Sequence, residues 1–284
     1  MGKKIGKYSR VFWKVVLIAV IFSVTIGAFV VKMEASASAD KADAYICMSA
    51  DTGEIFDRKN EHLRLPMAST TKTMTALVIL ENCLPDEIVE IDQTAVRVEG
   101  SSIYLKRGEK FTVKELLFGL MLRSGNDAAV ALAIHCAGSI ESFAGMMNLK
   151  AEELGLIDTH FVNPHGLHDP EHYTSAYDLC KIGCEAMKNP MFREIVNTKF
   201  VTVGEGENKR YWSNKNKILT TFDGGNGIKT GFTKNAGRCL IASATREGKT
   251  VVSVVLNRYD MFSECRTMME DAFSVIKSRE KAVG

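Results

Sequence analysis

The chain has 284 residues, of which 46% are hydrophobic, and its 36 basic and 34 acidic side chains leave a formal net charge of +2. This near-neutral balance suits a globular protein, and no basic block follows the N-terminal segment, so the sequence predicts no nucleic-acid partner. The seven cysteines are odd in number and irregularly spaced, which argues against a disulfide framework, and we expect them to pack as small apolar side chains.

The N-terminal segment has the order of a secretory signal peptide. Five basic residues lie within residues 3–14, an apolar run extends from Val15 to Val31, and small residues follow from Ala35 to Ala39. We therefore expect residues 1–39 to be a signal peptide, with an uncleaved membrane anchor as the alternative. In both cases residues 40–284 form an extracytoplasmic domain, either secreted or held at the outer face of the cell membrane or cell wall.

Apolar spacing predicts strands at both ends of this domain and helices between them. Strands are expected over residues 44–49 and from Ile55 onward; helices from Ser69 and over 113–122, 128–137 and 177–188; strands over 227–233, 238–245 and 250–257; and a closing helix over 262–277. The simplest arrangement is an α+β fold. One antiparallel sheet is built from both chain ends, with helices on its faces and an inserted helical lobe.

The first candidate catalytic motif is Ser69-Thr-Thr-Lys72, at the start of the first expected helix. Residues three apart share a helix face, so the Lys72 amine can reach the Ser69 hydroxyl. Lys72 can act as a base near neutral pH only if burial and a second cation lower its pKa, and Lys229 is the expected cation. The alternative is that Ser69 only caps the helix while Lys72 points to water.

Two further motifs follow in order, Ser124-Gly-Asn126 and Lys229-Thr230-Gly231. Ser124 is a candidate proton relay, and Asn126 suits a substrate peptide bond, although this tripeptide alone is typical of a turn. Lys229 and Thr230 suit a substrate carboxylate, and Gly231 lets an extended peptide lie along the strand edge. The alternative for the third motif is an edge-strand lysine that prevents aggregation.

Three histidines, His165, His168 and His172, lie close together in the sequence. The residues between the last two include Pro170, which prevents a shared helical face. We expect loop-stabilising hydrogen bonds from these side chains and no metal site.

Taken together, the motifs resemble those of the low-molecular-mass penicillin-binding proteins, the serine-type D-alanyl-D-alanine carboxypeptidases. The likeness runs from about residue 44 to residue 278 and includes MASTTKTMTA (67–76), RSGNDAA (123–129), FVNPHGL (161–167), HYTSA (172–176) and KTGFT (229–233). It implies a β-lactamase/transpeptidase-like fold. Many relatives continue into a C-terminal β-rich domain, which we do not expect in residues 40–284.

The resemblance implies a hydrolase that forms an acyl-enzyme. Ser69 would attack the penultimate D-alanine of a peptidoglycan stem pentapeptide, Lys72 would take the serine proton, and Ser124 would pass it to the departing D-alanine. The oxyanion would lie between the backbone N–H groups of Ser69 and Phe232. The substrate carboxylate would be oriented by Lys229, Thr230 and Thr233.

The resemblance also implies the partners of the enzyme. Neither a metal nor an organic cofactor is expected, and β-lactam antibiotics should acylate Ser69 as substrate mimics. A role in peptidoglycan biosynthesis, cell wall organisation and cell shape follows from the substrate. Contact with the membrane is expected only if the N-terminal segment is retained.

Two other functions remain as alternatives. A class A-like β-lactamase would usually have Ser-Asp-Asn in the second motif and a Glu-x-x-x-Asn element soon after it, whereas Glu185 to Asn189 is too distant here. The second alternative is an inactive wall-binding or penicillin-sensing module, against which the presence of all three motifs argues.

Overall fold

The computed structural model describes residues 42–206 and 209–283. Asp43–Gly284 form one compact unit. The expected signal peptide or anchor, residues 1–39, lies outside the described residues.

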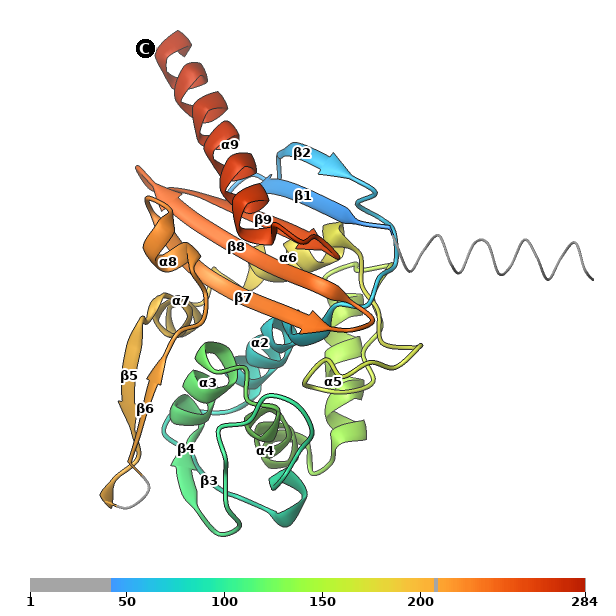
Figure 1. The fold of residues 1–284 in the computed structure, drawn as a ribbon, viewed down its shortest axis with the longest axis vertical. Coiled ribbons are helices and arrows are strands. Elements are labelled where there is room, and N and C mark those ends of the chain that lie inside the picture. The colour runs from blue at the N-terminus through green and yellow to red at the C-terminus, as the bar shows by residue number, and fades with distance from the viewer. Residues whose placement is uncertain (1–41, 207–208, 284) are drawn as a thin grey trace, which may run out of the picture. The chain divides into compact units, whose positions relative to one another are not determined.

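A five-stranded antiparallel sheet is built from both ends of this unit, which confirms the predicted fold class (Figure 1). Its strands are β1 (Ala44–Ser49), β2 (Ile55–Lys59), β7 (Gly225–Thr233), β8 (Gly237–Arg246) and β9 (Lys249–Leu256). The order is β2-β1-β9-β8-β7, so the N-terminal hairpin pairs with the C-terminal strands through β1 and β9. β7 is therefore an edge strand, and among the described residues no strand pairs with the other side of its backbone.

Alternating side chains give the sheet two apolar faces. Val251 and Val255 belong to the core cluster under α9 (Met261–Val283), whereas Val252 and Val254 belong to the larger core cluster on the other face. Figure 1 shows α9 across one face of the sheet and α6 (Ala176–Ala186) behind the other.

The chain between β2 and β7 forms both the helices that pack on the sheet, such as α6, and the inserted helical lobe. Its helices are η1 (Ala68–Thr71), α2 (Lys72–Asn82), η2 (Gln93–Ala95), α3 (Val113–Leu122), α4 (Asn126–Ala137), α5 (Ile140–Glu153), α6, α7 (Pro190–Asn197) and α8 (Ile218–Thr221). Two small hairpins accompany them, β3 (Ile88–Glu90) with β4 (Lys110–Thr112), and β5 (Phe200–Val203) with β6 (Arg210–Ser213).

Within the described ranges no single helix is long and apolar enough to cross a membrane. α4 and α5 are long and apolar enough only when they are taken together, and they are bent by 83° relative to each other.

Local capping explains where several helices begin and end. Thr112 and Glu115 form a capping box at the start of α3, so this helix begins where the sequence predicts it. Gly138 is left-handed and ends α4. The sequence reading missed α5 and α7, although their caps Ser139 and Asn189 are recognisable start signals, the second followed by proline.

Candidate active site

Ser69 lies in the short 3-10 turn η1 rather than in the first turn of an α-helix, which corrects the expected local structure. The Thr70 hydroxyl donates to the carbonyl of Met67 at 2.5 Å, and the Thr71 hydroxyl donates to the carbonyl of Ala68 at 2.8 Å. Such side-chain bonds to carbonyls three residues back compete with the α-helical pattern. Ala68 itself has a φ of 48°, a strained value for a residue with a Cβ. The turn therefore presents Ser69 in a fixed position ahead of α2.

Lys72, the first residue of α2, is wholly buried and reaches three oxygen atoms. Its amine donates to Ser69 Oγ at 3.0 Å, to Asn126 Oδ1 at 2.7 Å and to the carbonyl of His165 at 2.6 Å. Burial, and after it the charge of Lys229, hold the pKa of Lys72 well below its usual value. This side chain does not point to water, as it would if Ser69 served only as a cap.

The third motif lies on the edge strand β7, directly against the turn η1 that carries Ser69. A Cβ added to Gly231 would lie 3.1 Å from the backbone nitrogen of Ser69, so the strand and the turn are in close contact. Lys229 is 2% exposed, and its amine donates to the carbonyl of Thr230 at 2.9 Å. Burial and the charge of Lys215 lower the pKa of Lys229 to about 7.

The second motif links α3 to α4. Ser124 has a φ of 65°, and its side chain lines the same cleft as Ser69. Among the described residues no hydrogen bond joins the Ser124 hydroxyl to Ser69 or Lys72. Asn126 accepts from Lys72 and donates to the carbonyl of Glu99 at 2.6 Å, which leaves one amide N–H for a ligand.

Asp127 is a buried carboxylate that the sequence reading did not single out. It is 1% exposed and accepts from the backbone N–H groups of Ile103 and Leu105 and from the hydroxyl of Ser102. These bonds hold residues 101–105 against the start of α4, and Ser101 lines the cleft. Asp127 thus positions one wall of the site.

Two of the three histidines, His165 and His172, make the expected loop-stabilising hydrogen bonds. His172 Nδ1 accepts from the Val162 N–H at 3.1 Å, so Nε2 carries the proton and donates to Thr71 Oγ1 at 2.8 Å. Burial lowers the pKa of His172 to about 4 and that of His165 to about 3, so both rings are neutral near pH 7. His172 therefore supports the turn that carries Ser69.

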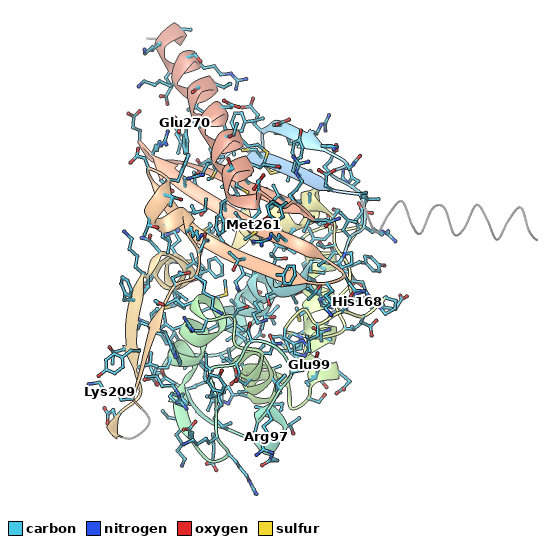
Figure 2. All side chains as sticks on the ribbon, in the orientation of Figure 1. Arg97, Glu99, His168, Lys209, Met261 and Glu270 are labelled. Carbon is cyan, nitrogen blue, oxygen red and sulfur yellow. The ribbon has the colours of Figure 1, made fainter. Side chains whose placement is uncertain are left out.

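A cleft of about 390 Å³ opens between the sheet edge and the helical lobe. Its lining residues are Ser69, Ser101, Ser124, Lys215, Thr230, Gly231, Phe232, Arg238, Met261 and Phe262. Figure 2 labels Met261 on the sheet side and Glu99 on the lobe side. Lys215 and Arg238 are cations that the sequence reading missed because neither belongs to a recognised motif.

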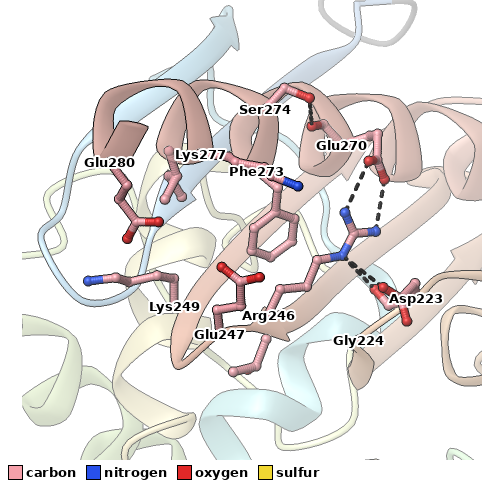
Figure 3. Close-up of a pocket in the computed structure, with 12 residues that line it drawn as sticks. Asp223, Gly224, Arg246, Glu247, Lys249, Glu270, Phe273, Ser274, Lys277 and Glu280 are labelled. Carbon is pink, nitrogen blue, oxygen red and sulfur yellow. Dashed lines mark hydrogen bonds and ion pairs between the residues drawn. The ribbon is translucent and has the colours of Figure 1, made fainter. Parts of the chain in front are cut away.

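Two features lie outside this cleft. Thr233 ends β7, its hydroxyl accepts from the Ala236 N–H at 3.0 Å, and it is not among the lining residues, so its role stays a prediction. A larger cavity of about 580 Å³ lies beside α9 and shares no lining residue with the cleft (Figure 3). Its Arg246 is already paired with Asp223 and Glu270.

Comparison with known proteins agrees with this geometry. The family model of D-alanyl-D-alanine carboxypeptidases matches residues 31–260. The D-alanyl-D-alanine carboxypeptidase DacF of Bacillus subtilis is 37% identical over 83% of this chain and 63% of its own length. A D-alanyl-D-alanine carboxypeptidase of a Streptomyces strain is 39% identical over 74% of this chain and 78% of its own. The chain thus spans just under two thirds of the Bacillus relative.

Solved structures give the same result. The crystal structure of the D-alanyl-D-alanine carboxypeptidase DacD from Francisella tularensis superposes with a TM-score of 0.77 at 30% identity, covering 81% of this chain and 70% of that one. A mutant of a Streptomyces DD-transpeptidase superposes with a TM-score of 0.77 at 36% identity, covering 81% and 97%.

Proposed function

This chain belongs to the D-alanyl-D-alanine carboxypeptidase family, and from that premise we propose that it removes the terminal D-alanine of peptidoglycan stem pentapeptides through an acyl-enzyme on Ser69. The observation that carries the proposal is the set of three partners around the Lys72 amine. Asn126 Oδ1 and the carbonyl of His165 can only accept hydrogen bonds, whereas the Ser69 hydroxyl can also donate one. Once the amine is neutral, the bond to Ser69 reverses: its two N–H bonds go to the first two acceptors, and its lone pair accepts the Ser69 proton.

The reaction then follows from the placement of these groups. Ser69 Oγ bonds to the carbonyl carbon of the penultimate D-alanine while its proton passes to Lys72. The backbone N–H groups of Ser69 and Phe232 stabilise the oxyanion, consistent with the close approach of β7 to the turn. The C–N bond breaks as Ser124 delivers the proton to the departing D-alanine. Water hydrolyses the resulting ester and frees Ser69.

The substrate is held through its carboxylate and its extended backbone. Lys229 and Thr230, with Thr233 as the expected third residue, orient the carboxylate, and Lys215 and Arg238 add positive charge to the cleft wall. The stem peptide adds to the free edge of β7 as a further strand. Asn126 donates its remaining amide N–H to the substrate backbone.

The polarity of the cleft favours a slow-turnover penicillin-binding enzyme over a class A-like β-lactamase. None of the ten described residues that line the cleft is a carboxylate, so a dedicated base for rapid hydrolysis of the penicilloyl ester is missing from this set. β-Lactams are therefore expected to acylate Ser69 and remain bound.

We place residues 40–284 outside the cytoplasm as the catalytic domain, because the peptidoglycan substrate is there. Residues 1–39 would serve as the signal peptide or, if uncleaved, as the membrane anchor.

The experiment is an assay of free D-alanine after incubation of the purified chain with a stem pentapeptide, with Ser69→Ala as the matched control. We expect free D-alanine from the wild type and none from Ser69→Ala. We also expect a penicilloyl adduct of the wild type that lasts longer than many turnovers of the pentapeptide. Rapid penicillin turnover would favour the lactamase, and inactivity toward both ligands would favour a binding module.

A further inference from the structure

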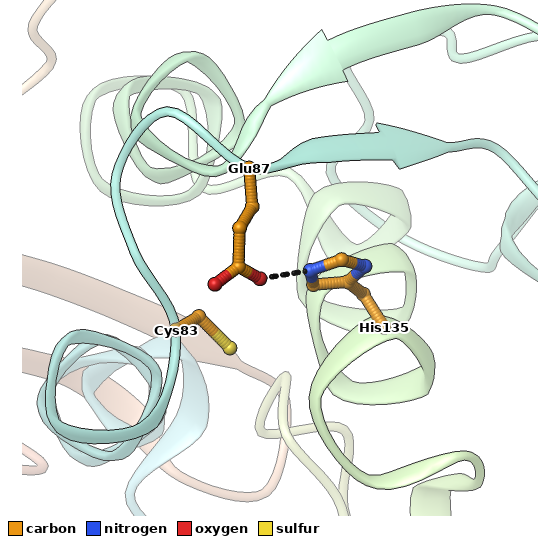
Figure 4. Close-up of side chains that lie close together, drawn as sticks. All are labelled: Cys83, Glu87 and His135. Atoms are coloured by element: carbon orange, nitrogen blue, oxygen red, sulfur yellow. Dashed lines mark hydrogen bonds and ion pairs between the residues drawn. The ribbon is translucent and has the colours of Figure 1, made fainter.

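A second group of chemically reactive side chains lies at the far ends of the two helices that begin with Lys72 and Asn126 (Figure 4). Cys83 directly follows α2, His135 lies in the last turn of α4, and Glu87 directly precedes β3. One ligand atom from each of these three side chains lies within 4.8 Å of the other two.

Specific contacts join these groups. His135 Nε2 and Glu87 Oε2 are 2.8 Å apart, and the other carboxylate oxygen of Glu87 accepts from the Leu84 N–H at 2.8 Å. The thiol of Cys136, the neighbour of His135 in α4, lies near the Cys83 thiol. Cys83 is buried, whereas the side chains of His135 and Glu87 are 24% and 39% exposed, so an ion can enter from solvent.

A thiol, an imidazole and a carboxylate make a ligand set suited to zinc. Zinc prefers four tetrahedral ligands with bonds of about 2.3 Å to sulfur and about 2.1 Å to nitrogen, which places ligand atoms about 3.5 Å apart. The three ligand atoms lie within 4.8 Å of one another, so they must approach by at most about 1.3 Å to reach that spacing. The ion would replace the proton shared by His135 and Glu87 and the thiol proton of Cys83. We propose that Cys83, Glu87 and His135 form a zinc site whose fourth ligand is water.

The surrounding backbone favours a cation at this place. Cys83 and His135 lie at the C-terminal ends of α2 and α4, and each of these ends carries a partial negative charge. The Leu84 N–H fixes one oxygen of Glu87 and leaves the other for the ion, an arrangement typical of outer-shell support in metal sites.

The consequence of binding is mechanical. α2 has 11 residues and is therefore about 16 Å long, so the ion would lie well away from the catalytic cleft. It would tie together the ends of two helices whose other ends hold the Lys72–Asn126 hydrogen bond. Because the site lies away from the cleft, its role is stabilisation of the catalytic lobe.

The test is zinc retention by the purified full-length chain. The reduced protein is mixed with one equivalent of zinc chloride and dialysed, and bound zinc is measured by mass spectrometry alongside thermal unfolding with and without zinc. Cys83→Ser and His135→Gln remove ligands, and Cys265→Ser is the matched control because this buried cysteine lies on α9 and belongs to the other core cluster. Cobalt substitution of the wild type gives a readout that needs no variant, through thiolate-to-cobalt absorption bands.

The proposal expects one zinc ion per chain and a zinc-dependent rise in melting temperature for the wild type and Cys265→Ser. Cys83→Ser and His135→Gln should bind zinc at least about 100-fold more weakly, the upper end of the loss seen even for outer-shell changes. The proposal is overturned if the reduced wild type retains no zinc, or if both ligand variants retain as much as the control. A Cys83–Cys136 disulfide that persists in the purified protein and blocks zinc would also overturn it.

Discussion

Replacing Gly166 with alanine tests whether the loop around this residue positions the nucleophile. Gly166 has a φ of +87°, and an added Cβ would lie 1.9 Å from the carbonyl oxygen of Ala68. Real Cβ contacts are essentially never found below 3.0 Å, so the turn that carries Ser69 and the loop that carries Gly166 must move apart by about 1.1 Å. A misplacement of about 1 Å lowers the rate of an enzymatic step by about 100-fold, which is the loss we expect in the rate of Ser69 acylation.

Gly53→Ala is the matched control for this substitution. Gly53 also has a positive φ, +74°, but an added Cβ meets nothing within 4 Å. This variant should lose only about 1 kcal/mol of stability from backbone strain, or about 2–4 °C in melting temperature, and should acylate normally. Stopped-flow acylation with a fluorescent penicillin and thermal unfolding measure the two effects. A folded Gly166→Ala protein that acylates as fast as Gly53→Ala would refute the reasoning.

Three further outcomes are expected. Lys229→Gln removes a charge that lowers the pKa of Lys72, so the pKa of Lys72 should rise. The acid limb of the pH–acylation profile should then move to higher pH, and an unmoved limb would contradict the coupling between the two lysines. The pKa of His172 is about 4 in the folded protein and 6.5 in the unfolded chain. The free energy of unfolding should therefore fall by about 3 kcal/mol as the pH decreases from about 6.5 to about 4. Urea unfolding of His172→Gln should lack this pH-dependent loss. Asp127→Ala orphans several buried donors, among them the Ile103 N–H, and should cost about 3 kcal/mol in urea unfolding; a loss below about 1 kcal/mol would contradict its positioning role.

Much of the fold could be predicted from the sequence because its signals are local. Residues 44–49 and 113–122 are a strand and a helix with the predicted bounds, since apolar spacing and a capping box mark them. The pairing of β1 with β9 could also be anticipated. Short turns join the strands within each chain end into hairpins, which leaves unpaired strand edges at each end, and an edge from one end can pair with an edge from the other. The hairpins β3–β4 and β5–β6 were missed because strands of three or four residues carry too little periodicity.

The residues of the site also fall into those that the sequence could predict and those that it could not. Ser69, Lys72 and Lys229 stand in short recognisable motifs, whereas Lys215 and Arg238 are brought to the cleft only by tertiary packing. The 3-10 turn at Ser69 depends on threonine hydroxyls and on the close approach of another loop, neither of which apolar spacing describes.

The proposed zinc site was missed for a related reason. Cys83 and His135 are far apart in the sequence, so spacing could not indicate that their ligand atoms lie close together.

Locating the acyl group tests the central claim most directly. After brief exposure to a penicillin, the chain should gain the mass of one antibiotic molecule, and peptide mapping should find it on Ser69 within residues 67–76. Appearance of the adduct should slow as the pH falls and Lys72 takes up a proton. An adduct on another residue, or none on a folded and concentrated protein, would contradict the account.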